Sequence, residues 1–495
     1  MNNLILRGLL CFGILYSCFI SPQVFAASSD LNDNGTPDSL ENEVLVLINK
    51  TLPAGEYTFN NLIISSSSIL TLEGDSESTE VFKGVKINAN NLVVEVGGGI
   101  SADRKGYSHG TGPGNTGNFS FQSGASYGGV GASFGGTIYG SATRPVDLGT
   151  GSGTNFGGGA IHLVVQNNIL NNGVVSADGG GSASGGSLLV ETNQLSGSGE
   201  FRAKGGGYSS TSVYYSPGGG GRIAIYYSTS TFSGVVSAGG GCGSLGMGYP
   251  FVCGGAGTAG LFDRTDNTLK TNGWRFQKND GAFVLNKIFI TSASVDVEKD
   301  ASVTATEITL DEGSSLNFID TAVFNVNQVF INNNSSLVSS GKENFSAQNL
   351  VVAGGSTVTV LSQNTLKLVI PNINISSDSF ITVDQKGYEL GGGPGAPLPY
   401  DPENPSSNAY LMGASHGGIG VGNTATSTYG SETEPVDFGS AGHGGNAKGG
   451  GAIRIISENF VNNGTVSANG SANGSGGSIY ISSESITGVG TFSAN

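Results

Sequence analysis

Residues 308–375 read ITLDEGSSLNFIDTAVFNVNQVFINNNSSLVSSGKENFSAQNLVVAGGSTVTVLSQNTLKLVIPNINI, and short apolar runs return in this stretch at a nearly constant spacing. The runs begin at Ile308, Val329, Leu350 and Ile373, so that successive starts lie 21, 21 and 23 residues apart. Between the runs lie Asn, Gly and Ser residues, and this alternation of β-branched runs and turn residues is typical of short strands. In each unit an apolar residue also returns eight positions after the start, at Leu316, Leu337, Val358 and Ile381.

A repeat of this length indicates a stack of similar units, because one short strand cannot bury its apolar face alone. Stacking places the four run starts above one another in a ladder and leaves free strand edges only at the two ends. The same eight-residue return occurs from Leu62 to Leu70 and from Leu92 to Ile100. We therefore predict an all-β fold, a right-handed parallel β-helix (β-solenoid) with coils of about 21 residues.

A second, longer repeat brackets this region, because residues 100–204 resemble residues 381–495. The matching segments are DRKGY (103–107) with DQKGY (384–388), GASYGG (124–129) with GASHGG (413–418), PVD (145–147) with PVD (435–437), GGGAI (157–161) with GGGAI (449–453), and NNG (171–173) with NNG (462–464). Agreement in this order indicates a duplication, and we name the two stretches copy one and copy two.

Glycine is the compositional outlier, with 84 residues of 495. The clusters at 157–159 and 218–221 directly precede the strand-like segments 160–165 and 222–227. Glycine permits positive φ and close backbone approach, so these clusters predict tight corners. The stretches 106–156 and 388–448 contain few large apolar residues, and we expect them to leave the stack as long glycine-rich flanking loops.

The predicted organisation follows from these patterns. It comprises a signal peptide at 1–26, a calcium-loop segment at 27–50, N-terminal β-helix coils at 51–99, a first glycine-rich module at 100–260, regular coils at 261–380 and a second glycine-rich module at 381–495.

The first residues predict export. Arg7 is the only charge before residue 27, an apolar stretch runs over 9–20, and Ala26 ends a small-residue cleavage pattern. Lipoprotein processing at Cys18 is the alternative. The predicted location is therefore secreted or on the cell surface. No other segment has the apolar length of a transmembrane span. The formal net charge of −16 argues against nucleic acid as a partner, since nucleic acid binding rewards basic patches.

Two cysteines remain after the predicted signal peptide, Cys242 and Cys253. They lie close together in an exported chain, which predicts a disulfide that closes one glycine-rich loop. A metal or redox site is the alternative, and no Cys or His cluster accompanies the pair.

Residues 30–41 read DLNDNGTPDSLE and carry the most specific local motif. Oxygen-bearing side chains stand at positions 1, 3, 5, 9 and 12 of this segment, and glycine stands at position 6, where a calcium loop turns sharply. This pattern predicts calcium as a cofactor. The predicted ligands are Asp30, Asn32, Asn34, Thr36 through its backbone carbonyl, Asp38 and Glu41. The alternative is a solvated acidic linker with an Asn-Gly turn.

The duplicated Asp-x-Lys-Gly-Tyr motif supplies further candidates for ligand contact. They are Asp103, Lys105 and Tyr107 in copy one, and Asp384, Lys386 and Tyr388 in copy two. Acid, base and aromatic groups together suit a carbohydrate ligand. The alternative is structural, with a cross-strand salt bridge and a tyrosine packed at the root of a loop. Duplication favours the structural role, because an enzyme usually has one site. We assign no catalytic residue.

The segments GGGAIRI (449–455), GGGGRIAIYY (218–227) and GSGGSIYI (474–481) resemble the glycine-rich repeats of large secreted bacterial surface proteins. Such proteins are similar in layout to β-helical adhesins, and the loop at 30–41 resembles those of EF-hands and dockerins. The resemblance implies a surface location and a binding, adhesion or scaffold role towards glycans or other surface components. The alternative is an extracellular polysaccharide lyase or glycoside hydrolase on a β-helix. The oligomeric state stays open.

Overall fold

The computed structural model describes residues 29–115, 123–133, 135–153, 155–207, 216–244, 251–318, 322–397, 412–421, 428–443 and 447–495. The predicted signal peptide and Cys18 lie outside the described residues. Across the described ranges the chain forms strands and no α-helix. Two short 3₁₀ turns, η1 (Asp38–Leu40) and η2 (Lys278–Asp280), are the helical elements of those ranges. The all-β prediction is therefore confirmed.

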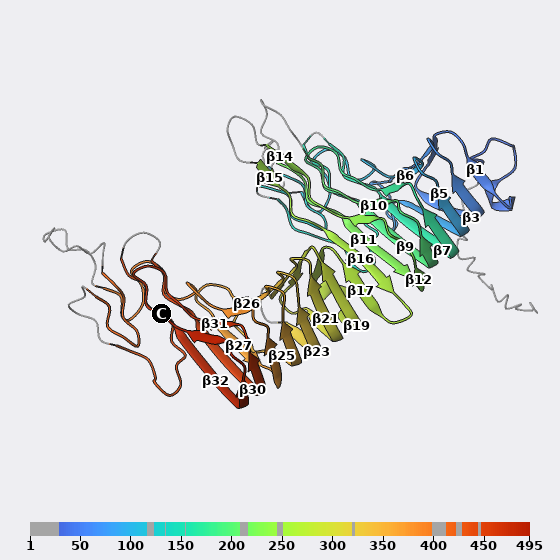
Figure 1. The fold of residues 1–495 in the computed structure, drawn as a ribbon. Coiled ribbons are helices and arrows are strands. Elements are labelled where there is room, and N and C mark those ends of the chain that lie inside the picture. Colours follow the sequence, from blue (N-terminus) through green and yellow to red (C-terminus); the bar gives the residue numbers. More distant parts are fainter. Residues whose placement is uncertain are drawn as a thin grey trace, which may run out of the picture.

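One long sheet runs through the whole molecule (Figure 1). Its strands are β1 (Val44–Val46), β3 (Gly55–Ile64), β5 (Val85–Val94), β7 (Ala160–Asn171), β9 (Ser187–Ser196), β11 (Arg222–Tyr227), β12 (Thr229–Ser230), β16 (Thr258–Asp263), β17 (Thr268–Thr271), β19 (Ala282–Thr291), β21 (Ser302–Asp311), β23 (Val323–Ile331), β25 (Phe345–Val352), β27 (Thr365–Val369), β28 (Asn372–Ile375), β30 (Ala452–Asn462) and β32 (Ser478–Thr487). Neighbouring strands are parallel throughout, with the exception of β16 and β17.

Two further parallel sheets accompany the long one, each built from the short strand that follows a long strand in the chain. The first contains β2 (Lys50–Leu52), β4 (Ile69–Leu72), β6 (Gly99–Ser101), β8 (Val174–Ser176), β10 (Glu200–Arg202) and β13 (Val235–Ser237). The second contains β18 (Trp274–Phe276), β20 (Ser294–Val297), β22 (Ser315–Phe318), β24 (Ser336–Ser339), β26 (Thr357–Val360), β29 (Phe380–Thr382), β31 (Thr465–Ser467) and β33 (Thr491–Ser493).

The predicted ladder of apolar run starts is confirmed by the strand register. Ile308 pairs with Val329, Val329 with Leu350, and Leu350 with Ile373. All four side chains are buried, and the residue after each of the four is more exposed, as alternation in a half-buried strand requires. The second ladder, from Leu316 through Leu337 and Val358 to Ile381, is confirmed in the same way.

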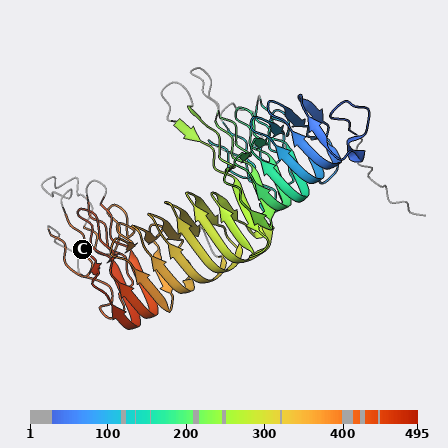
Figure 2. The same cartoon turned by 45° about the vertical axis from the view of Figure 1, so that its right-hand side comes forward.

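The single antiparallel pair of the long sheet, β16 with β17, lies where the molecule bends (Figures 1 and 2). The buried apolar core divides at the same place. One cluster runs from Leu31 to Ala259, and the members of the other lie mostly between Phe262 and Ala468. Trp274 is buried at this junction, with its ring 5.4 Å from the ring of Phe262. The bend divides the molecule into two arms, one before β16 and one from β17 onward. The Trp274 side chain packs the start of the second arm.

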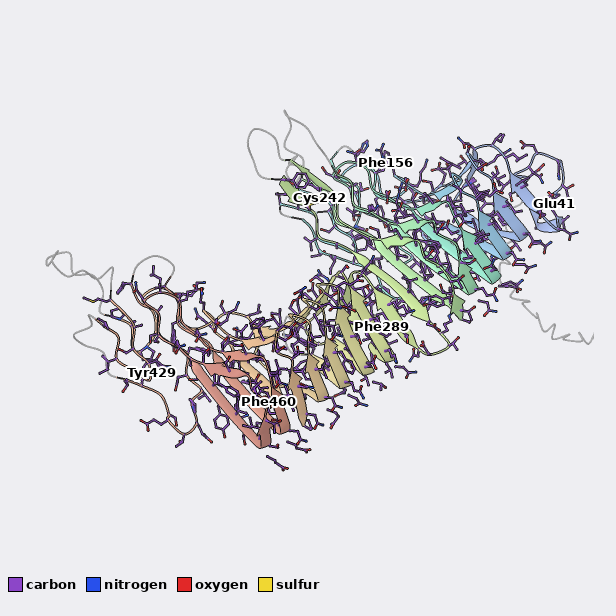
Figure 3. All side chains as sticks on the ribbon, in the orientation of Figure 1. Glu41, Phe156, Cys242, Phe289, Tyr429 and Phe460 are labelled. Atoms are coloured by element: carbon purple, nitrogen blue, oxygen red, sulfur yellow. A yellow bond between two sulfur atoms is a disulfide. The ribbon has the colours of Figure 1, made fainter. Side chains whose placement is uncertain are left out.

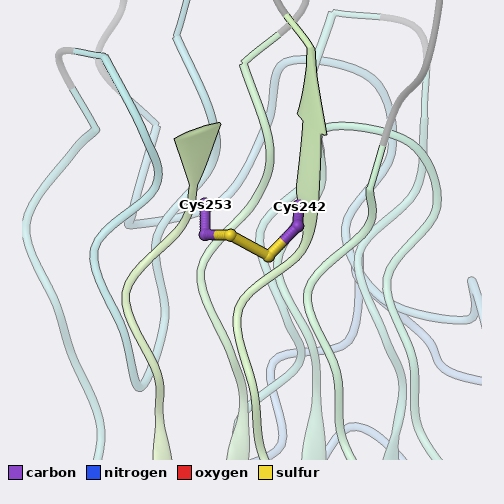
Figure 4. Close-up of a disulfide and its surroundings, with 2 residues drawn as sticks. All are labelled: Cys242 and Cys253. Atoms are coloured by element: carbon purple, nitrogen blue, oxygen red, sulfur yellow. A yellow bond between two sulfur atoms is a disulfide. The ribbon is translucent and has the colours of Figure 1, made fainter. Parts of the chain in front are cut away.

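The predicted disulfide between Cys242 and Cys253 is confirmed, with an S–S distance of 2.03 Å (Figure 4). The two cysteines face each other across a two-stranded antiparallel sheet, β14 (Cys242–Ser244) and β15 (Phe251–Cys253). This small sheet lies on the same flank of the molecule as the glycine-rich loop of copy one, away from the long sheet (Figures 1 and 3).

The glycine-rich flanks of both copies lie on the same side of the long sheet (Figures 1 and 2). Their glycines serve close packing of backbone against backbone. A Cβ atom on Gly158 would lie 2.0 Å from the carbonyl oxygen of Ala177, and one on Gly221 would lie 2.1 Å from that of Gly186. Neither glycine has a positive φ. Gly158 and Gly221 are therefore required for close approach of one backbone to another and not for a positive φ.

Candidate functional site

The predicted calcium loop brings three carboxylates together at the N-terminal end of the long sheet. Asp30, Asp38 and Glu41 each offer an oxygen, and these oxygens all lie within 4.8 Å of one another. Glu41 is labelled at that end in Figure 3, beside β1. Asn60 of β3 anchors the loop by donating its side-chain amide to the carbonyl of Glu41 at 2.5 Å.

The loop turns around its own acidic side chains. The Asp30 carboxylate accepts hydrogen bonds from the backbone N–H groups of Asn34 (3.1 Å) and Gly35 (2.8 Å). Gly35 has a φ of +84°, a conformation that favours glycine at this point of the turn. The side-chain amides of Asn32 and Asn34 both donate to one oxygen of Glu41, at 2.9 and 3.0 Å. The loop therefore gathers five of the six predicted ligand residues.

Asp38 is the buried member of the cluster. Its carboxylate accepts the backbone N–H of Leu31 at 3.0 and 3.1 Å, and η1 begins at this residue. Burial raises the pKa of the Asp38 carboxyl, and the negative charges of Glu41 and Asp30 act in the same direction. Hydrogen bonds from Ser29 and Leu31 oppose the rise. Three carboxylates at this separation repel one another unless a cation or a proton intervenes.

The donor set fits a hard divalent cation. One oxygen of Glu41, Oε1, is buried and has no hydrogen-bond partner in the structure. Asp30, Asp38 and Glu41 turn carboxylate oxygens towards one another. Asn32 and Asn34 turn amide nitrogens towards Glu41, and a 180° rotation about the terminal bond would present their oxygens instead. Calcium takes six to eight oxygen ligands of this kind. Thr36, the sixth predicted ligand, donates its backbone N–H to the side-chain oxygen of Asn34 at 2.7 Å.

The Asp-x-Lys-Gly-Tyr motif of copy one is spread over several structural contacts. Asp103 accepts the backbone N–H of Asp178 at 2.7 Å, and Lys105 forms an ion pair with Glu73 at 2.7 Å. Tyr107 lies at the root of the flanking loop, where its backbone N–H donates to the carbonyl of Gly149 at 3.0 Å. The motif joins coils to each other and to the loop.

Copy two repeats the contacts of the aspartate and of the tyrosine. Asp384 accepts the backbone N–H of Asn469 at 2.6 Å, and the backbone N–H of Tyr388 donates to the carbonyl of Gly439 at 3.1 Å. The intervening residues Arg104 and Gln385 both adopt a φ of +58°. The carboxylate therefore has the same bonded role in both copies, which is to hold the turn of the next coil.

Each flanking loop is held by a pair of aromatic rings in tilted contact. In copy one the Tyr127 and Tyr139 rings lie 4.6 Å apart, and the Tyr139 hydroxyl donates to the carbonyl of Leu148 at 2.6 Å. In copy two the His416 and Tyr429 rings lie 4.6 Å apart, and Tyr429 makes the equivalent bond to Phe438 at 2.6 Å. The copies differ in one of these two rings, which is tyrosine in copy one and histidine in copy two.

Sequence reasoning missed Arg222 as a residue of special interest. This arginine is fully buried behind the ring pair of copy one. Its Nε donates to the carbonyl of Tyr139 at 3.0 Å, and Nη2 donates to Gln277 at 3.2 Å. In the sequence Arg222 follows four glycines and precedes an apolar segment, so it was predicted only to begin a strand. The local sequence pattern gives no sign that its side chain is buried.

Copy two has a hollow beside its ring pair. The hollow has a volume of about 660 Å³ and is lined by residues that include His416, Gly417, Tyr429, Glu432 and Gly476. It lies at the C-terminal end of the long sheet, where Tyr429 is labelled in Figure 3. Sequence reasoning missed this feature as well, because it depends on which coil covers which loop.

Comparisons of the chain with family models, with curated proteins and with solved structures found no match. Within the ranges that the structure describes, no helix has the length and apolarity needed to cross a membrane.

Proposed function

We propose that the protein is a secreted or cell-surface scaffold with a binding or adhesion role, built as a right-handed parallel β-helix. The observation that carries this proposal is the duplication of the glycine-rich flank, which repeats its carboxylate, backbone and ring-pair contacts in both copies. A binding or structural element gains from being repeated along a stalk, because two sites on one rigid body act together.

The strand register supports the β-helix. Long strands pair in parallel with the long strand of the following unit, and short strands pair with the following short strand in the same steps. In such a fold the chain passes from the long sheet to the accompanying sheet and back once in every unit. The buried ladders of apolar side chains are then enclosed between the two sheets. A stack of this kind is stiff, because each unit bonds to its neighbours along its length.

Calcium at the N-terminal loop is part of the proposal. Asp30, Asp38 and Glu41 would hold the ion, with Asn32 and Asn34 completing the oxygen set. Bound calcium supplies positive charge that relieves the repulsion among the three carboxylates. These residues would then cap the first strands of the stack, which leaves fewer free backbone groups at that end.

Glycans are the proposed ligands of the two flanks, and a polysaccharide panel tests this directly. The chain is immobilised and exposed to acidic and neutral polysaccharides, with binding and product release measured together. Retention of a polysaccharide without chain cleavage supports the binding role. Release of unsaturated or reducing ends would instead establish the lyase or hydrolase alternative.

The matched variants for this panel are Asp103→Ala, Asp384→Ala and the double variant. Because each carboxylate holds a backbone N–H of the next coil, single replacement should loosen one flank and leave the other in place. Retention should then fall by about half in each single variant and more steeply in the double variant, as expected for two linked sites. Retention that is the same in all variants would argue against the flanks as the binding surfaces.

A further inference from the structure

The outer face of the first short-strand sheet carries a cavity in copy one. The cavity has a volume of about 220 Å³, and its lining includes Ile69, Gly99, Ser101, Asp103, Val174 and Arg202. We name it the Gly99 cavity. It spans β4, β6, β8 and β10, each of which pairs with a strand on both sides. The cavity therefore lies inside the sheet and not at an end of the stack (β6 and β10 are labelled in Figure 1).

Gly99 creates this cavity because it contributes no side chain. Its neighbours in the sheet are Ile69 and Val174, and the residue after each of these three is buried in the core, so that the three face outward. A Cβ atom on Gly99 would lie 3.4 Å from the carbonyl oxygen of Val174 and 3.9 Å from Cγ1 of Ile69, which are ordinary contact distances. Gly99 does not have a positive φ. The backbone therefore allows a side chain at this position, and the sequence leaves the place empty.

Copy two fills the equivalent place with an aromatic ring. Phe380 is the counterpart of Gly99, because it pairs with Thr465 of β31 as Gly99 pairs with Val174 of β8. The Phe380 side chain is 40% exposed, as expected for a ring on the outer face of a sheet. Copy two thus shows that a six-membered ring fits at this position of the fold.

The two copies also differ in the groups beside this place. Charged residues of copy one stand where copy two has neutral polar ones: Asp178, Glu200 and Arg202 have the counterparts Asn469, Thr491 and Ser493. The aspartate at the cavity is the same in both copies, as Asp103 and Asp384. Copy one therefore combines a missing ring with a set of charged groups at its edge.

Two of these groups are placed to bind one hydroxyl group together. Oδ1 of Asp103 accepts the backbone N–H of Asp178, whereas Oδ2 lies 3.9 Å from Nη2 of Arg202. That distance is too long for a hydrogen bond between the two side chains. A ligand hydroxyl between them can accept from the guanidinium and donate to the carboxylate. The Ser101 hydroxyl, which accepts the backbone N–H of Asp103 at 3.2 Å, adds a further polar group to the lining.

The charges at the cavity favour a neutral ligand. Asp178 and Glu200 form ion pairs with Arg202 at 2.7 and 3.3 Å, and Lys204 forms one with Glu200 at 2.9 Å. With Asp103, this gives three carboxylates and two cations, and therefore one net negative charge. An anionic ligand would meet this excess of carboxylates, because the only arginine at the cavity is already paired.

We propose that the Gly99 cavity binds one neutral pyranose ring of a glycan. The ring occupies the place that the Phe380 ring takes in copy two, with its apolar face against Ile69 and Val174. Its hydroxyl groups bond to Asp103 and Arg202. The volume is below the roughly 300–1,000 Å³ of sites for larger organic ligands, which limits the occupant to one ring. This inference rests on the proposed glycan-binding role, and it adds a site outside the two flanks that copy two lacks.

Binding of single sugar units to the full chain tests the proposal. The probes are the methyl glycosides of glucose, galactose and mannose, titrated and followed by saturation-transfer NMR. Methyl glucuronide serves as the anionic comparison, and p-cresol as the aromatic one. We expect saturable binding of at least one neutral glycoside, with a dissociation constant on the order of 1 mM for a ligand of this size. Methyl glucuronide and p-cresol should bind at least about tenfold more weakly.

The test variant is Gly99→Phe, which gives copy one the residue that copy two carries at this position. The fold should be unchanged, because the same ring is accommodated at Phe380, and binding should weaken by at least about tenfold. Gly99→Ala is the milder second variant, since its methyl group enters the cavity at ordinary contact distances and should weaken binding by about threefold. The matched control is Gly153→Phe, at an exposed glycine of copy one whose Cβ would meet nothing within 4 Å.

The outcomes separate this site from the proposed function. Glycoside binding that falls in both Gly99 variants and is kept in Gly153→Phe supports the cavity, even if the polysaccharide panel shows no retention by the flanks. Absence of glycoside binding, or equal binding in the unmodified chain and in both Gly99 variants, overturns the cavity and leaves the panel to decide the role of the flanks. Tighter binding of p-cresol or of methyl glucuronide than of every neutral glycoside would overturn the assigned ligand.

Discussion

The guanidinium of Arg222 lies 5.6 Å from the centre of the Tyr127 ring, and both side chains are completely buried. One nitrogen of this arginine, Nη1, has no hydrogen-bond partner in the structure. The positive charge of Arg222 is stabilised by the face of the Tyr127 ring, by the Tyr139 carbonyl and by the side chain of Gln277. This one side chain thus connects the flanking loop of copy one to β11 and to the start of the second arm.

Replacement of Arg222 by alanine should destabilise the protein by about 3 kcal/mol, because it leaves buried acceptors unpaired and opens a cavity. Chemical denaturation followed by tryptophan fluorescence measures this, since Trp274 is the single tryptophan and lies at the junction. Arg454→Ala is the matched control, because Arg454 also lies over a ring, that of Tyr480, but is not buried. The control should lose less than about 1 kcal/mol. Equal losses would contradict the role given to burial.

The stability of the N-terminal loop should depend on pH in opposite directions with and without calcium. The pKa of Asp38 is raised in the folded protein, so its contribution to stability is full below the unfolded pKa and is lost as the pH rises through the folded value. Without calcium, the loop should therefore weaken as the pH rises from about 3.8, the unfolded reference value, towards neutrality. With calcium bound, deprotonation favours the ligand and the loop should instead strengthen over the same range.

Hydrogen exchange of the β1 and β3 amides, with calcium and with chelator, measures this effect. Asp38→Asn should abolish the calcium response and should protect these amides in chelator at neutral pH, because it removes a buried charge next to Glu41 and Asp30. At a calcium concentration of about 100 times Kd, the unmodified chain should gain about 2.7 kcal/mol. Glu43→Gln, which changes an exposed neighbour outside the cluster, is the control. An identical calcium response in Asp38→Asn would rule out the site.

Two equivalent glycines should respond differently to the same substitution. Gly128→Ala places a methyl group 2.2 Å from the Gly221 carbonyl oxygen and should cost about 1–3 kcal/mol through overpacking. Gly417→Ala places its methyl group in open space and should change stability by less than about 0.5 kcal/mol. Thermal unfolding of the two variants side by side provides the measurement. A larger loss in Gly417→Ala would show that copy two is also packed at this place.

Removal of the disulfide should act locally. Cys242 and Cys253 close a loop with a sequence separation of 11 residues, for which chain entropy predicts about 3 kcal/mol. The double serine variant should therefore show faster exchange of the β14 and β15 amides, which among the described strands pair only with each other. Amides of β9 and β11 should keep their protection, because the long sheet holds them independently. Faster exchange throughout copy one would indicate that the disulfide supports the whole flank.

The stacked strands were predictable because the repeat encodes register directly. A spacing of 21 residues places Val329 over Ile308, and the eight-residue return places Leu337 over Leu316 in the accompanying sheet. The gathering of Asp30, Asp38 and Glu41 was also predictable, since a twelve-residue loop with glycine at its sixth position must fold onto itself.

The buried arginine and the open hollow were not predictable in this way. Arg222 meets its backbone partner Tyr139 across 83 residues, most of which follow no strand period. The path of such a loop depends on which backbones can approach closely, and composition does not specify that. The antiparallel pairing of β16 with β17 could not be predicted either. A strand that reverses its direction keeps the same alternation of apolar and polar side chains, so the sequence pattern does not change there.

That reversal has a consequence for cooperativity. In a parallel stack each unit contributes its own stability and the contacts to its two neighbours, so unfolding spreads from unit to unit. Between β16 and β17 the stack changes direction, and the apolar core divides at the same residues. Unfolding that begins in one arm therefore meets a boundary there. The two arms should lose structure in separate transitions, so that the half carrying one flank stays folded while the other opens.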